Sequence, residues 1–151
     1  MIFIRPAIKE DAQKIVSFQI RMAYETEAMH LDAETVSKGV EQLFKKPEKG
    51  WYWIAENEAH DAVGCCLTLR EWSDWRNGSV IWLHSVYVIP ETRKSGVFKT
   101  MYAYLKRYVD ENEKLRGIRL YVDKTNHNAI KAYQNAGMNG EHYQLFEWMK
   151  E

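Results

Sequence analysis

The stretch SVYVIPETRKSGVFKTMYAYL, residues 85–105, decides the fold that we expect. Its first part is an apolar run typical of a strand that ends at Pro90, and apolar residues recur at helical spacing after Gly96. Arg93 and Lys94 lie in the connection between the two patterns. Since the first N–H groups of a helix lack intrahelical partners and carry partial positive charge, such a connection can hold a phosphate group. The alternative is an ordinary solvated loop, where basic residues and glycine are also common.

The patterns on either side of this stretch complete one domain of residues 1–151. Asp32 predicts a helix N-cap, and Asn77–Gly78 predicts a tight hairpin turn with positive φ at both positions. An antiparallel meander followed by a β-α-β unit predicts an α/β (α+β) fold with a mixed, mostly antiparallel sheet and helices on its faces. The expected elements are strand 2–8, helix 10–22, helix 33–44, strand 51–56, strand 62–72, strand 79–89, helix 96–108, strand 117–122, helix 126–137 and strand 142–149.

Composition narrows the classes of function. Twenty-one basic residues balance twenty-one acidic ones, so we expect no general attraction to nucleic acid or to an anionic membrane. No apolar run approaches the roughly 18 residues of a membrane span, and no signal-peptide pattern opens the chain. Cys65 and Cys66 would face opposite sides of a strand, which disfavours a disulfide and indicates a reduced, cytoplasmic protein. The histidines lack ligand-like spacing, so no metal site is expected.

Two segments together resemble the GNAT superfamily of N-acetyltransferases, which use acetyl-coenzyme A. The first follows V-x-V-x-P and then [RQ]-x-x-G-x-[GA], matched by Val86, Val88, Pro90, Arg93 and Gly96. The second follows N-x-x-A-x-x-x-Y-x-x-x-G-[FM], matched by Asn126, Ala129, Tyr133, Gly137 and Met138. Phe98 departs from the pattern, because the family usually has Gly or Ala there. We expect the Phe98 ring to turn into the core, since it follows the apolar stripe of its helix.

The resemblance implies a three-layer α-β-α fold and a site for acetyl-coenzyme A. In the family, the strand before the phosphate loop splays from its neighbour at a bulge, and its backbone pairs with the pantetheine arm. A backbone N–H on this strand can stabilise the oxyanion, and the N–H groups of residues 94–98 hold the pyrophosphate. The residues that the resemblance assigns to acetyl-coenzyme A are Val86, Tyr87, Val88, Arg93, Lys94, Ser95, Gly96, Val97, Phe98, Asn126, Ala129 and Tyr133.

Amine acetylation also calls for a base and an acid, because the acceptor must lose a proton and the departing thiolate must gain one. The resemblance makes Tyr133 the acid candidate, while the alternative is a core tyrosine packed with its helix. His84 is a candidate base with a suitable intrinsic pKa, and the alternative is a packed strand histidine. Strand alternation would place His84 on the face of Val86 and Val88. Glu71, at the end of the neighbouring strand, is the rival base.

Candidate acceptor residues lie in two other places. Glu25 and Glu27 fall between the first two helices, where the family usually builds its acceptor site, and a solvated acidic loop is the alternative. EWSDWRNG, residues 71–78, resembles a hairpin of bacterial GNAT proteins of unassigned substrate. There Trp72 and Trp75 could line an acceptor pocket, and Asp74 or Glu71 could hold an ammonium group. The alternative is a stiff turn whose indoles cover the sheet edge or a dimer contact.

The function expected from the resemblance is acetyl transfer from acetyl-coenzyme A to a small-molecule amine or a peptide amino terminus, by direct attack in a ternary complex. One rival is a non-catalytic acyl-coenzyme A sensor on the same fold. Another is a protein-interaction module that uses the Trp-rich hairpin. The sequence leaves the acceptor open, and a homodimer is the first assembly to consider beyond a monomer.

Overall fold

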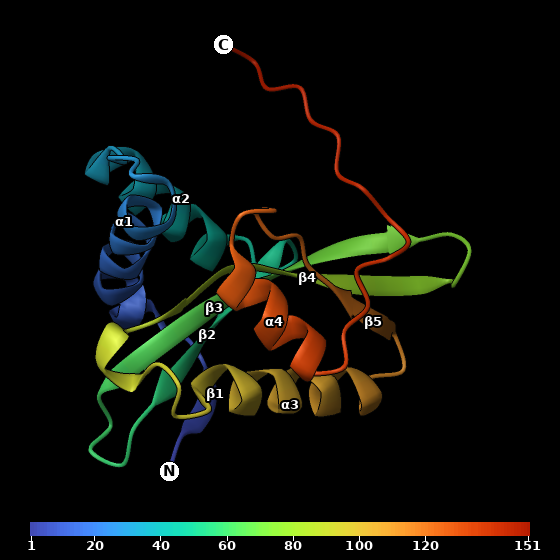
Figure 1. Ribbon diagram of the computed structural model, residues 1–151, viewed down its shortest axis with the longest axis horizontal. Helices are drawn as coiled ribbons and strands as arrows, with labels where there is room; N and C mark the ends of the chain where they lie inside the picture. The colour runs from blue at the N-terminus through green and yellow to red at the C-terminus, as the bar shows by residue number, and fades with distance from the viewer. The chain divides into compact units, whose positions relative to one another are not determined.

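A five-stranded sheet in the order β1-β2-β3-β4-β5 organises the first part of the chain (Figure 1). The computed structural model describes residues 1–151, which divide into two compact units, 1–120 and 121–151, each described here by itself. β1 to β4 pair antiparallel, and β4 pairs with β5 in parallel. The strands are β1 (Phe3–Pro6), β2 (Gly50–Glu56), β3 (Ala62–Ser73), β4 (Gly78–Val88) and β5 (Leu115–Arg119).

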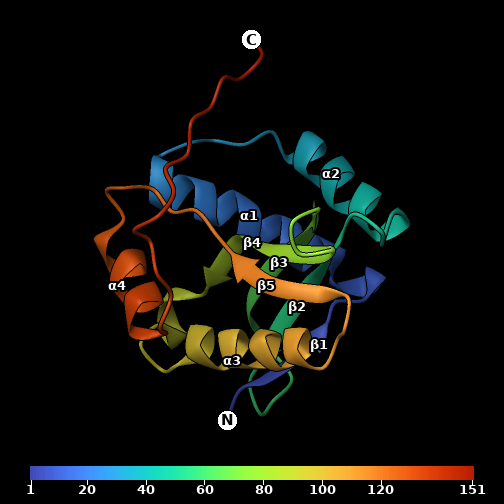
Figure 2. The ribbon, with the colours of Figure 1, turned by 90° about the vertical axis from the view of Figure 1, so that its right-hand side faces the viewer.

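Helices cover both faces of this sheet, which confirms the expected fold class. In the first unit, α1 and α2 lie on one face and α3 lies on the other (Figure 2). None of the helices is long and apolar enough to cross a membrane. The helices are α1 (Ala12–Glu27), α2 (Ala33–Lys45) and α3 (Val97–Asp110) in the first unit and α4 (His127–Asn135) in the second, with short 3-10 turns at Lys9–Asp11 and Pro90–Thr92.

Strand alternation divides the core into two clusters, one under each helical layer. Cys65 packs with Phe18 and Tyr87 on the α1 side, whereas Cys66 packs with Leu83 and Met101 on the α3 side. The adjacent cysteines therefore face opposite sides of β3, as expected, and both are free thiols. Successive residues in the buried part of β3 thus pack under alternate helical layers.

Local caps explain where several elements begin. The Asp32 carboxylate accepts hydrogen bonds from the Thr35 N–H at 2.9 Å and the Thr35 hydroxyl at 2.6 Å, which confirms the expected N-cap of α2. The hairpin after β3 differs from the expectation. Its turn spans residues 74–77, and only Asn77 has positive φ, at 46°. Gly78 already pairs with Ser73 as the first residue of β4, so the turn has four residues instead of two.

The end of the chain also differs, because the strand expected at residues 142–149 is not formed. A strand is stabilised when a neighbouring strand accepts its hydrogen bonds and one alternating row of side chains is buried. Each row mixes apolar and polar side chains here, with Tyr143 in one and Phe146 and Trp148 in the other. These three side chains are 80%, 86% and 87% exposed, so the alternation selects no buried face.

Two glycines provide a matched test of backbone packing. A Cβ at Gly50 would lie 2.3 Å from the Thr68 carbonyl oxygen on β3, whereas a Cβ at Gly39 in α2 would meet nothing within 4 Å. Gly50→Ala should destabilise the fold by about 1–3 kcal/mol, because β2 and β3 must separate. Gly39→Ala should stabilise it by about 1 kcal/mol through helix propensity. Urea unfolding of both variants checks this, and equal shifts of the same sign would contradict the register of β2 and β3.

Candidate functional site

The centre of the candidate site is a bulge in β4. Cys65 of β3 pairs with Tyr87, while Leu67, two residues further along β3, pairs with His84. Two steps on β3 therefore match three steps on β4, which leaves one extra residue on β4. Ser85 lies within the extra step and has φ of 52°, in the left-handed region. The bulge that the family resemblance implies is thus present at this position.

Beyond the bulge, β4 has an open edge. Its pairing with β5 covers only Ser79 to Trp82, and β5 itself ends at Arg119. Residues 83–88 of β4 therefore have no partner strand on that edge within the first unit. An extended ligand can pair with unpaired backbone groups of this kind as an added strand.

The bulge also reverses which way the following side chains face. Leu83, Val86 and Val88 all pack against the α3-side cluster. Because Leu83 faces α3, its neighbour His84 faces the α1 side. The expectation that His84 shares a face with Val86 and Val88 is therefore wrong, since simple alternation does not count the extra residue. Val86 and Val88 are partly buried in this layer.

The loop after β4 presents backbone donors at the start of α3. Lys94 has φ of 69° and Gly96 has φ of 81°. The first intrahelical hydrogen bond runs from the Thr100 N–H to the Gly96 carbonyl at 2.9 Å, so the N–H groups of residues 97–99 have no intrahelical acceptor. A Cβ at Gly96 would meet nothing within 4 Å, which leaves the space in front of the loop open. These features fit a diphosphate group held by backbone N–H groups.

The ring of Phe98 was expected to turn into the core, but it does not do so. It is half-buried and stacks on Tyr102, with ring centres 6.0 Å apart and planes 12° apart. The buried stripe of α3 is formed by Val97, Met101 and Leu105. Phe98 is one residue further round the helix than Val97, a rotation of about 100°, which places its ring at the margin of that stripe.

Two residues expected in different parts of the site meet each other. Glu25, an acceptor candidate in the last turn of α1, accepts a hydrogen bond from Arg93 Nη2 at 2.5 Å. It also accepts one from the Tyr87 hydroxyl at 3.0 Å. Arg93 Nε donates to the Val88 carbonyl at 2.8 Å. No signal in the sequence pairs these residues, because Glu25 and Arg93 lie 68 positions apart.

The two candidate bases lie on the same face of the sheet but apart. Leu67 is opposite His84, and Glu71 is four residues further along β3, roughly 13 Å away at the usual rise of a strand. Burial lowers the pKa of His84 below its ordinary value, so its imidazole is neutral near pH 7. Glu71 is half-exposed and pairs with Arg119 at 3.3 Å. The two residues are therefore alternatives rather than a cooperating pair.

The second motif lies in the second unit and forms the short helix α4. The Asn126 side chain accepts a hydrogen bond from the Ala129 N–H at 3.2 Å and caps the helix. Gly137, just after the helix, has φ of 87°. Tyr133 is half-buried, and burial raises its pKa above the ordinary value, so the hydroxyl keeps its proton at neutral pH. That protonation state is the one a general acid requires.

The tryptophan-rich hairpin is held by the Arg116 side chain of β5 and by a side-chain hydrogen bond within its own turn. Arg116 donates to the Arg76 carbonyl at 3.0 Å and to the Asn77 carbonyl at 3.1 Å. The Asp74 carboxylate accepts a hydrogen bond from the Trp75 N–H at 3.0 Å. Trp72 and Trp75 are 64% and 88% exposed, and Glu27 is exposed at the end of α1. These indoles point away from the core rather than lining it.

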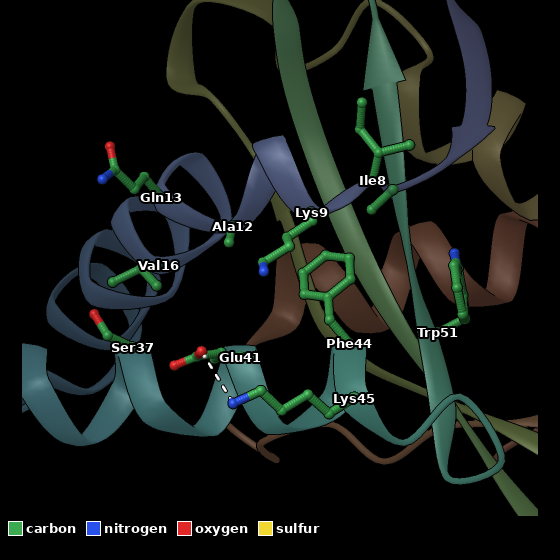
Figure 3. A pocket seen from close by; sticks show the side chains of 11 residues that line it. Ile8, Lys9, Ala12, Gln13, Val16, Ser37, Glu41, Phe44, Lys45 and Trp51 are labelled. Atoms are coloured by element: carbon green, nitrogen blue, oxygen red, sulfur yellow. Dashed lines mark ion pairs between the residues drawn. The ribbon is translucent and has the colours of Figure 1, made fainter.

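A pocket of about 830 Å³ lies elsewhere, between α1, α2 and the start of β2 (Figure 3). Its apolar wall includes Val16, Phe44 and Trp51, while Glu41 and Lys45 form an ion pair beside it. None of the residues expected at the site lines this pocket. The apolar residues of α1 that do line it recur at helical spacing, a pattern that in the sequence indicates only core packing. No group of three or more His, Cys, Asp or Glu side chains is placed to hold a metal ion.

Comparisons with known proteins agree with this arrangement. The model of the acetyltransferase (GNAT) family matches residues 10–138. A structure described as a "possible acetyltransferase" from Clostridium difficile 630 is 36% identical, with 100% of this chain and 99% of that chain covered and a TM-score of 0.91. No curated protein matches the chain.

More distant structures share the fold alone. AAC(6')-Iy in complex with the bisubstrate analogue CoA-S-monomethyl-acetylneamine is 18% identical, with 99% of each chain covered and a TM-score of 0.76. Glucosamine-6-phosphate N-acetyltransferase from Arabidopsis thaliana is 14% identical, again over 99% of each chain, with a TM-score of 0.72.

The half-buried position of His84 predicts a measurable titration. Its pKa should lie below 6.5, because burial disfavours the imidazolium. Its contribution to folding stability is therefore present above pH 6.5 and is lost as the pH falls through the folded-state pKa. NMR titration of the imidazole measures the pKa, and urea unfolding of His84→Gln across this window measures the linkage. A pKa of 6.5 or higher would contradict the environment described here.

Proposed function

Because the chain belongs to the GNAT family of acetyltransferases, we propose that it transfers the acetyl group of acetyl-coenzyme A to a primary amine. The amine belongs to a small molecule or to a peptide amino terminus. The observation that carries the proposal is the open edge of β4 at residues 83–88, directly followed by a loop with free N–H groups at the start of α3. Together they can hold the extended arm and the diphosphate of one ligand.

In this proposal the chain binds acetyl-coenzyme A mainly through its backbone. Val86, Tyr87 and Val88 supply N–H and C=O groups at the open edge. Ser95, Gly96, Val97 and Phe98 frame the turn into α3, and the Lys94 ammonium adds positive charge nearby. Asn126 and Ala129 of the second motif complete the set that the resemblance assigns. Acetyl-coenzyme A supplies the thioester whose C–S bond breaks as the C–N bond forms.

The side chains of the protein would manage the protons. His84 is neutral near pH 7 and can accept the proton that the acceptor ammonium must lose. Glu71 is the alternative base, acting directly or through water. Tyr133 holds its proton and can donate it to the departing thiolate. A backbone N–H at the open edge of β4 can stabilise the negative charge that develops on the carbonyl oxygen.

Acidic and aromatic residues are the proposed contacts for the acceptor. Glu27 and Asp74 would favour a cationic amine, and Trp72 offers an exposed ring surface on the same hairpin as Asp74. One fold neighbour, a glucosamine-6-phosphate N-acetyltransferase, acetylates an amine by name, which makes amines the first acceptor class to screen. The alternative function is an acyl-coenzyme A sensor, which would bind the same ligand without turnover.

Gly96→Asp should weaken acetyl-coenzyme A binding at least about tenfold, equivalent to about 1.4 kcal/mol. Aspartate tolerates a positive φ better than most residues, so the loop is retained while a negative charge is added beside the diphosphate. Isothermal titration calorimetry measures the affinity, with ATP and NAD as ligand controls. Gly39→Asp, at an exposed glycine of α2, is the matched control and should bind like the parent chain. Equal affinity of the Gly96 variant would overturn the assignment of the loop.

Tyr133→Phe should lower turnover about 10²-fold with little change in acetyl-coenzyme A affinity, because it removes the proton donor and keeps the ring. An amine screen that detects the released thiol gives the rate, and calorimetry gives the affinity. Tyr143→Phe, at an 80% exposed tyrosine, is the control. Unchanged turnover would mean that the acid is water or another residue. Binding without turnover on any amine would favour the sensor.

A further inference from the structure

A clamp of three side chains links the end of α1 to the end of β4. Glu25 Oε1 accepts a hydrogen bond from the Tyr87 hydroxyl at 3.0 Å, and Glu25 Oε2 accepts one from Arg93 Nη2 at 2.5 Å. The Arg93 guanidinium also lies 5.5 Å from the centre of the Tyr87 ring. Both carboxylate oxygens are thus engaged by residues more than 60 positions away in the sequence.

The clamp determines what the Arg93 side chain can do. Besides its bond to Glu25, Arg93 donates from Nε to the Val88 carbonyl at 2.8 Å. These contacts use Nε and Nη2 of the guanidinium and restrict the directions in which Arg93 can reach a phosphate. Lys94, which is exposed and forms no ion pair in the described chain, has no such ties. Lys94 is therefore the less restrained of the two cations in the loop, and Arg93 is held toward Glu25 and the Val88 carbonyl.

The same contacts hold the loop that follows β4. By bonding to the Val88 carbonyl, Arg93 closes the segment 88–93 on itself around the 3-10 turn at Pro90–Thr92. The next residue, Lys94, has φ of 69°, a conformation that is costly for a residue with a side chain and persists only when its surroundings impose it. The clamped Arg93 is immediately before it, so the clamp supplies part of that constraint.

Glu25 completes the connection to the other side of the site. It lies three residues before Ala28, whose φ of 50° ends α1 and begins the connection to α2. Partial burial acts to raise the pKa of Glu25, but hydrogen bonds from Arg93 and Tyr87 outweigh this effect and hold the pKa below its ordinary value. The clamp is therefore ionised throughout the neutral range.

We propose that Glu25 is a positioning residue, which holds Arg93 on the Val88 carbonyl and so sets the N–H groups of residues 94–98 for the diphosphate. The inference rests on the proposed function, because it takes acetyl-coenzyme A as the ligand of the loop. It reverses the roles expected from the sequence. Glu25 serves the donor side of the site, and Arg93 acts through the loop backbone rather than by touching phosphate.

The sign of one affinity change separates this role from direct phosphate binding. In Glu25→Gln the neutral amide no longer holds Arg93, so acetyl-coenzyme A should bind about tenfold more weakly. If Arg93 were a phosphate ligand, releasing it from Glu25 would leave the affinity unchanged or raise it. Glu48→Gln, at an exposed glutamate far along the chain, is the matched control. Calorimetry measures the affinity for acetyl-coenzyme A of the parent chain, of Glu25→Gln and of Glu48→Gln.

A second pair of variants tests the coupling. Arg93→Lys keeps the charge but cannot bridge the carboxylate and the carbonyl at once, so it should also weaken binding. The double variant Glu25→Gln/Arg93→Lys should bind acetyl-coenzyme A about as tightly as whichever single variant has the lower affinity. The reason is that both changes break the same clamp. Additive losses would overturn the proposal. Should Glu25→Gln fail to fold in a thermal melt, Tyr87→Phe removes one of the two hydrogen bonds that hold Glu25 and should also weaken binding. Direct phosphate binding by Arg93 would leave the affinity of that variant unchanged.

A readout without ligand separates this inference from the proposed function. In the free protein, a ¹³C titration of the Glu25 carboxyl should give a pKa below 4.5, and Arg93→Lys should raise it. Suppose that the Glu25 pKa is low, that it rises in Arg93→Lys, and that the parent protein does not bind acetyl-coenzyme A. That result would overturn the proposed function and leave the clamp in place. An ordinary Glu25 pKa would overturn the clamp itself. Normal ligand binding with an unaffected Glu25→Gln would overturn only the positioning role.

Discussion

The extra residue that β4 carries at Ser85 is the constraint on which the rest of the site depends. The side chains after this residue no longer continue the alternation of those before it. The residue lies three positions beyond Trp82, where the pairing of β4 with β5 ends. Val86 and Val88 then pack toward α3 while Tyr87 packs toward α1. The backbone between them is left with an unpaired edge, although its side chains are firmly packed. A rigid strand with an open edge is a suitable support for an extended ligand.

The loop that follows is held from both layers of the fold. Val97, at the start of α3, is buried in the α3-side cluster, while Arg93 reaches across to Glu25 at the end of α1. The left-handed residues Lys94 and Gly96 lie between these two anchors. A conformation that an isolated peptide would rarely adopt is thus imposed by packing on one side and by charge on the other. Preorganised N–H groups bind an anion without first paying an ordering entropy.

Several features were predictable because their causes are local. Helical spacing identified α3, the Asp32 cap identified α2, and the paired motifs at residues 85–105 and 126–138 indicated the family. Other features depend on partners distant in the chain. The face of His84 depends on the register between β3 and β4, and the hairpin at Asn77 gained two residues because Gly78 pairs with Ser73. Residues 142–149 show that alternation without a selected face does not make a strand.

The sequence by itself determined the order of elements up to α4, the opposite facing of Cys65 and Cys66 on β3, and the glycine and basic residues of the loop before α3, because these follow from spacing within a few turns of chain. Only the tertiary structure decided that Glu25 and Arg93 are partners, that His84 faces the α1 side, and that the edge of β4 opens after Trp82. The physical reason is that these features arise where segments from different parts of the chain pack together. A single inserted residue there changes every later contact.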